Sequence, residues 1–294
     1  MVQGMFASLA IVGKLVFPEL PPSALVVIRV GGAALVLAVA YLASGPQRIS
    51  SLRDWSLLAV LGFLGVTANQ SLFLGGLERT TAINASILVT TIPVFTVFYS
   101  VLARQERASA LKVGGIVLAG LGAVYLIGPD RVSLAPRLAL GNAMVVAAMM
   151  CYAGFLVISK PLLRRYDTLT VSLFVMAFGL LGTLPLGLPV LGRLELSRIA
   201  ATTWLWVGYI ILVPTVGAYF LNAWALKRTS SQLVAAFIYL QPLFTAAVAP
   251  AVLRGERLTE RALGAGAAIF SGLALVIWGE ARRRLHGPVD PLWD

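Results

Sequence analysis

Apolar stretches long enough to cross a membrane follow one another along almost the whole chain, and this pattern limits the fold more than any other feature. Only short charged or Pro/Gly-containing breaks separate them. Of the 294 residues, 59% are hydrophobic and 12% charged, whereas soluble domains carry about 25% charged residues. So few polar residues could not cover the exterior of a soluble protein, and the sequence predicts an integral membrane protein.

The charges and the Pro/Gly breaks divide the chain into ten apolar spans. Inside lipid the backbone has no water to bond to, so spans of this length must be helices, while barrel strands would be about ten residues long and alternating. We therefore expect an all-α polytopic membrane protein with ten transmembrane helices. The spans are expected near residues 1–17, 24–43, 55–75, 82–103, 110–127, 138–159, 169–191, 203–223, 232–253 and 261–279.

An internal repeat divides the chain into two halves. Arg79, Thr80, Pro93, Phe95 and Thr96 match Arg228, Thr229, Pro242, Phe244 and Thr245 at one spacing. After one residue of slippage, Arg104, Glu106, Arg107, Gly114 and Gly122 match Arg254, Glu256, Arg257, Gly264 and Gly272, and near the start of each half Lys14 matches Lys160. We expect five-helix units over residues 1–130 and 137–280, followed by a cytoplasmic basic tail over 281–294. Because five is odd, the second unit must cross the membrane inverted, a plan found in many secondary transporters.

The repeat register makes the first helix unusually short. The sixth span begins near Ala139, but the matching point of the first half falls before Met1. Residues 1–17 would span about 25 Å, against about 30 Å of hydrocarbon. Either residues that precede Met1 are missing or the native helix is short.

The distribution of basic residues gives a weak orientation. With the N-terminus inside, thirteen Lys and Arg face the cytoplasm and nine face the other side, and without Arg282–Arg284 the count is ten against nine. The positive-inside rule thus favours cytoplasmic termini, and we expect a bacterial-type inner (plasma) membrane.

Several function classes lack the residues they would need. The net charge of +11 comes from basic residues scattered between the spans, so nucleic-acid binding is not expected. Cys151 is the sole cysteine and His286 the sole histidine, which leaves no disulfide, no metal site and no catalytic constellation. A phosphate-binding loop of the GxxxxGK[ST] kind is also absent. We expect neither an enzyme nor a cofactor.

Two segments of the repeat resemble a known family. RTTAINASILVTTIPVFTVFYSVLARQERAS and RTSSQLVAAFIYLQPLFTAAVAPAVLRGERLT are similar to the two copies of the EamA repeat of the drug/metabolite transporter superfamily. Pro93, Pro242 and Glu256 match its proline in the fourth helix and its acidic turn before the fifth, while Arg104-Gln105-Glu106 departs from the usual turn. The resemblance covers nearly the whole chain. It implies a ten-helix exporter or facilitator with a central cavity, and amino acids and related metabolites as substrates.

Polar residues deep in the spans are candidates for lining that cavity, since unpaired polar groups are costly in lipid. The amides are Asn69, Gln70, Asn84, Asn142, Asn222 and Gln241, and the rings with a polar atom are Tyr152, Trp224 and Tyr239. This mixture suits a zwitterionic or aromatic small molecule. Hydrogen bonds between helices, an interfacial belt or plain packing are the alternatives.

Three further sets of residues each have more than one interpretation. Arg29, inside the second span, meets a substrate carboxylate, pairs with another helix or snorkels to the surface, and its place near the span's start favours snorkelling. Lys14 and Lys160 flank a cavity mouth or simply end their helices. Pro93 and Pro242 are candidate hinges, or they fix a bend that packing requires.

Acidic residues are absent from the middle of every predicted span. Glu19, Glu78, Glu106, Glu195 and Glu256 lie at ends or in loops, which argues against a membrane-buried proton-carrying acid. We expect export or facilitated movement of amino acids or related neutral or zwitterionic compounds by alternating access. The alternatives are a drug or organic-solute exporter of the same superfamily, a non-transporting scaffold or an intramembrane enzyme. The expected partners are a small-molecule substrate and the lipid bilayer, with the protein a monomer or homodimer.

Overall fold

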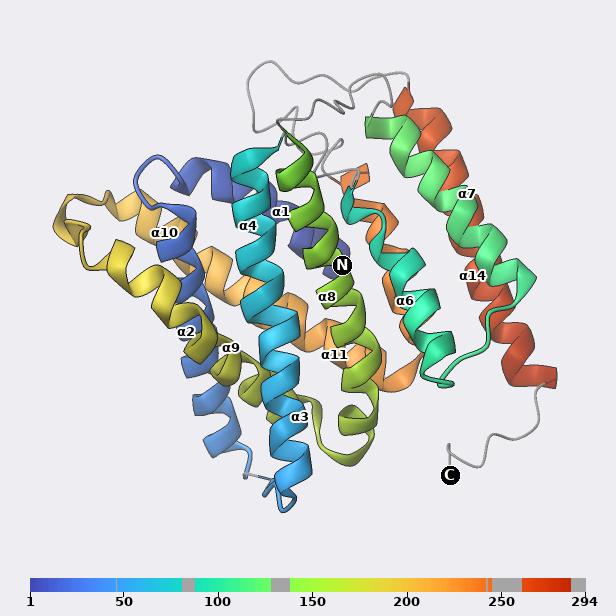
Figure 1. The fold of residues 1–294 in the computed structure, drawn as a ribbon, viewed down its shortest axis with the longest axis horizontal. Helices are drawn as coiled ribbons and strands as arrows, with labels where there is room; N and C mark the ends of the chain where they lie inside the picture. The colour runs from blue at the N-terminus through green and yellow to red at the C-terminus, as the bar shows by residue number, and fades with distance from the viewer. Residues whose placement is uncertain (46, 81–87, 128–137, 242, 245–260, 287–294) are drawn as a thin grey trace.

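The computed structural model describes residues 1–294 apart from 46, 81–87, 128–137, 242, 245–260 and 287–294 (Figure 1). Every regular element in this part of the chain is a helix. The first half contains α1 (Val2–Val16), α2 (Pro22–Ala43), α3 (Leu52–Gly62), η1 (Phe63–Ala68), α4 (Asn69–Arg79), α6 (Ile92–Leu102) and α7 (Ala110–Ile127). The second contains α8 (Ala139–Arg165), α9 (Thr168–Leu191), η4 (Leu196–Arg198), α10 (Ala201–Ile210), η5 (Ile211–Gly217), α11 (Ala218–Arg228), α12 (Ser231–Ala236), η6 (Phe237–Tyr239) and α14 (Arg261–His286).

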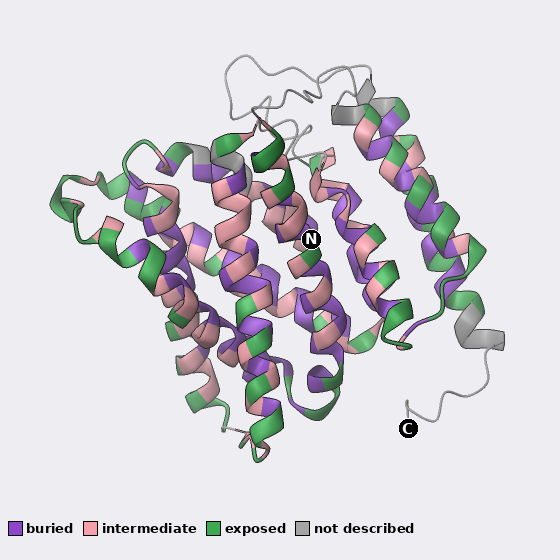
Figure 2. Cartoon of the chain, viewed as in Figure 1, coloured by how far each residue is buried: buried purple, intermediate pink, exposed green. Residues whose placement is uncertain are grey.

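The helices have the length and composition of membrane spans. Six helical stretches of the described chain are long and apolar enough to cross a bilayer: Pro22–Ala43, Leu52–Gly76, Ala139–Arg165, Thr168–Leu191, Ala201–Arg228 and Gly264–Arg282. Large apolar side chains such as Leu35, Leu121 and Leu205 are exposed, and buried residues gather on the sides where helices face one another (Figure 2). Exposed apolar side chains are expected where a protein contacts lipid. The prediction of an all-α polytopic membrane protein with ten helices is confirmed.

Helices from equivalent positions of the two halves pack against each other. α2 packs on α9, α7 on α14 and α6 on α12. The third span of each half instead contacts the first span of the other, so α4 packs on α8 while α10 and α11 pack on α1. A two-fold axis in the membrane plane produces this pattern, and it is consistent with the predicted inverted repeats. Figure 1 shows α7 and α14 side by side at one edge of the bundle.

Glycines allow the halves to approach closely at these contacts. A Cβ atom on Gly115 of α7 would lie 2.5 Å from the carbonyl oxygen of Gly272 in α14. One on Gly187 of α9 would lie 2.2 Å from the side chain of Val27 in α2. Small residues at helix crossings replace the hydrophobic driving force that lipid removes.

Several predicted span boundaries differ from the structure. α8 continues past Pro161 to Arg165, and α14 continues to His286, into the predicted tail. In the fourth span, Thr90 and Thr91 form a turn and Pro93 lies in the first turn of α6. Proline has no N–H to bond to the preceding turn, which explains why α6 begins here.

Candidate functional site

Each half has a π-helical segment at the same place in its third span. η1 joins α3 to α4, and η5 joins α10 to α11. π segments are rare and frequently occur at functional sites. Pro214 lies inside η5, where its missing N–H favours a departure from the α-helical pattern. The residues that directly follow these two segments lie at the centre of the polar site.

Gln70 and Tyr219 connect the two halves at this centre. Gln70 Nε2 donates hydrogen bonds to Tyr219 Oη and to Asn69 Oδ1, both at 3.2 Å. Asn69 Nδ2 donates to the carbonyl oxygen of Ala148 in α8 at 2.9 Å. Gln70 and Tyr219 are separated by the same number of residues as Arg79 and Arg228, so they are repeat equivalents and mark the pseudo-two-fold axis.

Arg29 lies on α2, which packs against α4 and against η5, the segments that carry Gln70 and precede Tyr219, and it is 3% exposed. Its Nη1 atom has no hydrogen-bond partner in the described part of the chain, and its guanidinium is close enough to Tyr219 to interact with it electrostatically. The expectation that Arg29 snorkels is wrong. α2 packs between α9 and η5, which turns this position toward the protein interior.

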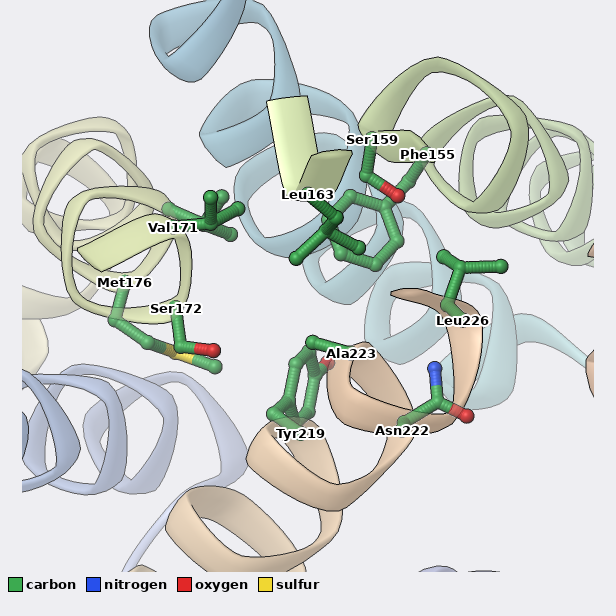
Figure 3. A pocket seen from close by; sticks show the side chains of 11 residues that line it. Phe155, Ser159, Leu163, Val171, Ser172, Met176, Tyr219, Asn222, Ala223 and Leu226 are labelled. Atoms are coloured by element: carbon green, nitrogen blue, oxygen red, sulfur yellow. The ribbon is translucent and has the colours of Figure 1, made fainter. Parts of the chain in front are cut away.

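A narrow cavity begins at Tyr219 and lies between α8, α9 and α11 (Figure 3). The hydroxyls of Ser159 and Ser172 and the amide of Asn222 line it together with apolar side chains. Ser172 Oγ is buried without a hydrogen-bond partner among the described residues. The cavity has a volume of about 20 Å³, enough for about one water molecule. It must widen to admit a metabolite.

Ion pairs with buried carboxylates join the two halves at the face where α3 begins and α8 ends. Arg165 Nη1 lies 3.0 Å from Asp54 Oδ1, and Tyr166 Oη donates to Asp54 Oδ2 at 2.8 Å. This hydrogen bond raises the pKa of the Tyr166 phenol. Lys112 forms an ion pair with Glu280, which also accepts a hydrogen bond from Ser230 at 2.9 Å.

Glu106 forms the third pair at this face and is 4% exposed. Lys160 Nζ lies 2.9 Å from its Oε1. The backbone N–H groups of Ser231 and Gln232, at the start of α12, donate to the same carboxylate at 2.6 and 3.3 Å. These N–H groups would otherwise have no partner in the helix. We call Asp54–Arg165, Glu106–Lys160 and Lys112–Glu280 the three inter-half ion pairs, because each joins the first half to the second.

The structure brings some of the predicted residues together and separates others. Asn69, Gln70, Arg29, Tyr152 and Asn222 lie at or near the central site. The ring of Tyr152 stacks on that of Phe155, which lines the cavity, and Asn222 lines the cavity itself.

The other candidates lie elsewhere. Asn142 accepts a hydrogen bond from Thr80, and Gln241 donates to Gln3 at 2.7 Å. Tyr239 packs with α7 and α14. Trp224 is 45% exposed beneath Arg228, so it lies on the outer surface and not in the cavity. Asn84, Pro242, Glu256 and the side chain of Lys14 fall outside the described residues.

Sequence reasoning missed Tyr219, Ser159, Ser172, Pro214 and Glu280. Extending the repeat register to Gln70 would have identified Tyr219. A serine in an apolar span gives no comparable signal, since its hydroxyl usually bonds to its own helix, as Ser159 does to Leu156. In the part of the chain that is described, no three His, Cys, Asp or Glu side chains gather where they could hold a metal ion.

Comparison with known proteins gives the family. A profile of the EamA-like transporter family matches residues 4–128 and 139–278. An uncharacterized transporter of Archaeoglobus fulgidus is 28% identical over 66% of this chain and 66% of its own length. A WAT1-related protein of Arabidopsis thaliana is 27% identical over 81% of this chain and 68% of its own length.

Two further comparisons cover more of both proteins. A probable terminal-alkyne amino-acid exporter of Streptantibioticus cattleyicolor is 28% identical over 84% of this chain and 81% of its own length. A crystal structure with 20% identity superposes with a TM-score of 0.80 over 96% of each chain, which shows a shared fold. With ten helices in two matched repeats, the chain belongs to the EamA-like transporter family and is a membrane transporter, not an enzyme.

Proposed function

We propose that this protein is a secondary transporter that exports amino acids or related zwitterionic metabolites by alternating access. One observation carries the proposal. A polar site lies inside the protein at the junction of the two halves, and the three inter-half ion pairs join the halves at one face. A solute bound at such a site can reach one side only when the halves separate there. The similar probable amino-acid exporter supports the substrate class.

The repeat suggests how the alternate state arises. Glu256 is equivalent to Glu106, Lys14 to Lys160, and the segment after Arg79 to the start of α12. We propose that Glu106 separates from Lys160 in the alternate state, so that the halves part at the face with the three inter-half ion pairs. Inverted repeats exchange conformations between their halves in this way.

We further propose that the face with the three inter-half ion pairs is cytoplasmic and that the membrane is a bacterial-type plasma membrane. Arg48, Arg53, Arg107 and Arg164 accompany the pairs at this face and are at least partly exposed. Alkaline phosphatase fused after residue 107 should be inactive, and fused after residue 194 it should be active. The reverse result would invert the orientation.

Counterflow into proteoliposomes tests the function. The purified full-length protein is reconstituted and loaded with unlabelled amino acid, and the entry of labelled amino acids, nucleosides and cationic dyes is measured with and without a pH gradient. We expect amino-acid flux that does not require the gradient, since the buried carboxylates of the described chain lie at one face in ion pairs. Flux of dyes alone would instead support the drug-exporter alternative, and no flux at all would refute transport of these classes.

A further inference from the structure

We propose that Arg29 binds a carboxylate group of the transported molecule. This inference rests on the transport function proposed above. It narrows the substrates to monoanionic carboxylates and zwitterions, and it assigns the residue that recognises them.

The first argument is the unbalanced charge of Arg29. An arginine guanidinium stays protonated in proteins, and a buried charge is costly unless it is paired. Arg29 is 3% exposed with Nη1 unpartnered in the described chain. The buried carboxylates of Asp54, Glu106 and Glu280 are paired at the closed face. None of the described carboxylates is therefore left to balance the charge of Arg29, and a bound anion could do so.

The second argument is a free donor beside that charge. Tyr219 Oη accepts a hydrogen bond from Gln70 at 3.2 Å, so its own proton remains to be donated, and no described acceptor takes it. Arg29 and Tyr219 come from opposite halves, on α2 and α11. A carboxylate has two oxygens, so it can accept from both groups, and such charge-assisted bonds are strong.

The single positive charge of Arg29 favours ligands with one negative charge and disfavours cations. One guanidinium balances one negative charge, whereas a phosphate monoester carries about two at neutral pH. A cationic drug would add a second positive charge to a buried site. Arg29 is thus matched to a carboxylate.

The cavity accommodates the remainder of a zwitterion. In Figure 3, Ser172 and Asn222 lie on either side of Tyr219. Ser172 Oγ has no hydrogen-bond partner among the described residues, and the Asn222 amide also lines the cavity. Their oxygens can accept from an ammonium group, and Met176 and Leu226 line the cavity beside them with apolar surface.

The test compares ligands that differ only in the carboxylate. Thermal unfolding of the full-length protein in detergent is measured with the proteinogenic amino acids and with acetate, butyrate and phenylacetate. The amino acid that stabilises most is then compared with its amide and its decarboxylated amine, by thermal shift and by counterflow. The variants are Arg29→Gln and the matched surface control Arg193→Gln, whose side chain is exposed.

We expect the amide and the amine to bind at least about tenfold more weakly, because a hydrogen bond to a charged group is lost. Arg29→Gln should remove this preference and Arg193→Gln should keep it. The unfolding temperature of Arg29→Gln without ligand should not fall, because no counter-charge is left unpaired.

Other outcomes separate this inference from the proposed function. If Arg29→Gln keeps the preference, if the amide is transported as well as the acid, or if the variant is strongly destabilised, the carboxylate site is refuted while transport stands. If no carboxylate shifts the unfolding temperature of the unmodified protein, the site is refuted as well. A carboxylate-dependent shift without flux supports the site and refutes the proposed transport.

Discussion

At the scale of single residues, buried charges occur in two different settings. The carboxylates of Asp54, Glu106 and Glu280 each have a basic partner at one face, and hydrogen-bond donors surround them. Arg29 instead is buried, and its Nη1 atom has no hydrogen-bond partner among the described residues. Buried pairs are costly to break, while an unpaired buried charge is available to a ligand. The paired carboxylates therefore serve to close one face of the protein, whereas Arg29 is proposed to recognise the substrate.

Tyr219→Phe should weaken substrate binding without unfolding the protein. The change removes the acceptor for Gln70 and the hydroxyl proposed to contact the carboxylate. Net hydrogen-bond energies of about 1 kcal/mol correspond to a rise in KM of about fivefold, measured by amino-acid counterflow. Tyr209→Phe, which removes the Tyr209 to Ser8 hydrogen bond elsewhere, should leave KM unchanged. Equal effects of the two substitutions would contradict a specific role for Tyr219.

Tyr166 gives a prediction of pH dependence. Its hydrogen bond to Asp54 raises the phenol pKa in the folded protein. The stabilisation is thus fully present below the ordinary tyrosine pKa of about 10 and is lost as the pH rises through the raised value. Unmodified protein should be more stable than Tyr166→Phe at pH 7.5, and the difference in unfolding temperature should shrink above pH 10. A constant difference would contradict this assignment.

The central site could be predicted only in part from the sequence. Asn69 and Gln70 stood out because amides are costly in an apolar span. The burial of Arg29 depends on which face of α2 meets α9, and its distance from the span's start did not reveal that. From the sequence, Trp224 could have lined a cavity or faced the lipid. The packing of the helices puts it on the outer surface of the protein.

At the scale of helices, close backbone contacts decide which substitutions the protein tolerates. α7 and α14 cross at Gly115 and Gly272, whereas a Cβ atom on the adjacent Gly114 would meet no other part of the described chain within 4 Å. Neighbouring glycines on one helix thus have different roles. Sequence alone could not separate them, because both fit the small-residue pattern of membrane helices.

Gly115→Ala should destabilise the α7–α14 pair, and Gly114→Ala should not. The new methyl group would overlap the Gly272 carbonyl, and overpacking of this kind costs about 1–3 kcal/mol. Thermal unfolding of both variants in detergent, followed by tryptophan fluorescence, measures the difference. Equal unfolding temperatures would show that the two helices can separate without loss of stability.

The ten helices and their repeat were predictable because lipid leaves an apolar segment of this length no other structure. The π segments were not, since an added residue in a helix turn leaves no clear mark on hydrophobic periodicity. Pro214 was a local sign of one of them, but η1 contains no proline.

At the scale of the whole molecule, the three inter-half ion pairs lie at one face and connect halves of opposite orientation. Opening that face requires the pairs to separate together, so weakening one should shift the balance between conformations. Glu106 is the clearest choice, because it accepts from Lys160 and from the start of α12 at once.

Glu106→Gln should make the cavity more accessible from that face. Ser172→Cys, in a protein whose Cys151 is replaced by Ala, reports access through its rate of reaction with a water-soluble thiol reagent. We expect labelling at least about tenfold faster in Glu106→Gln, since breaking a buried pair costs several kcal/mol. Glu195→Gln, which breaks an exposed pair with Arg198, is the control. An unchanged rate would show that the ion pair does not hold this face closed.

The π segments also give each third span a second way to arrange its residues. A helix with a wide turn contains more residues than its length needs, and the surplus can pass along the helix one turn at a time. Each residue that the wide turn passes rotates by about 100°, the angle per residue of an α-helix. Gln70 and Tyr219 lie two residues after the ends of such turns. A short migration of the wide turn would therefore rotate these side chains away from a bound solute, while both ends of the helix stay anchored in the membrane.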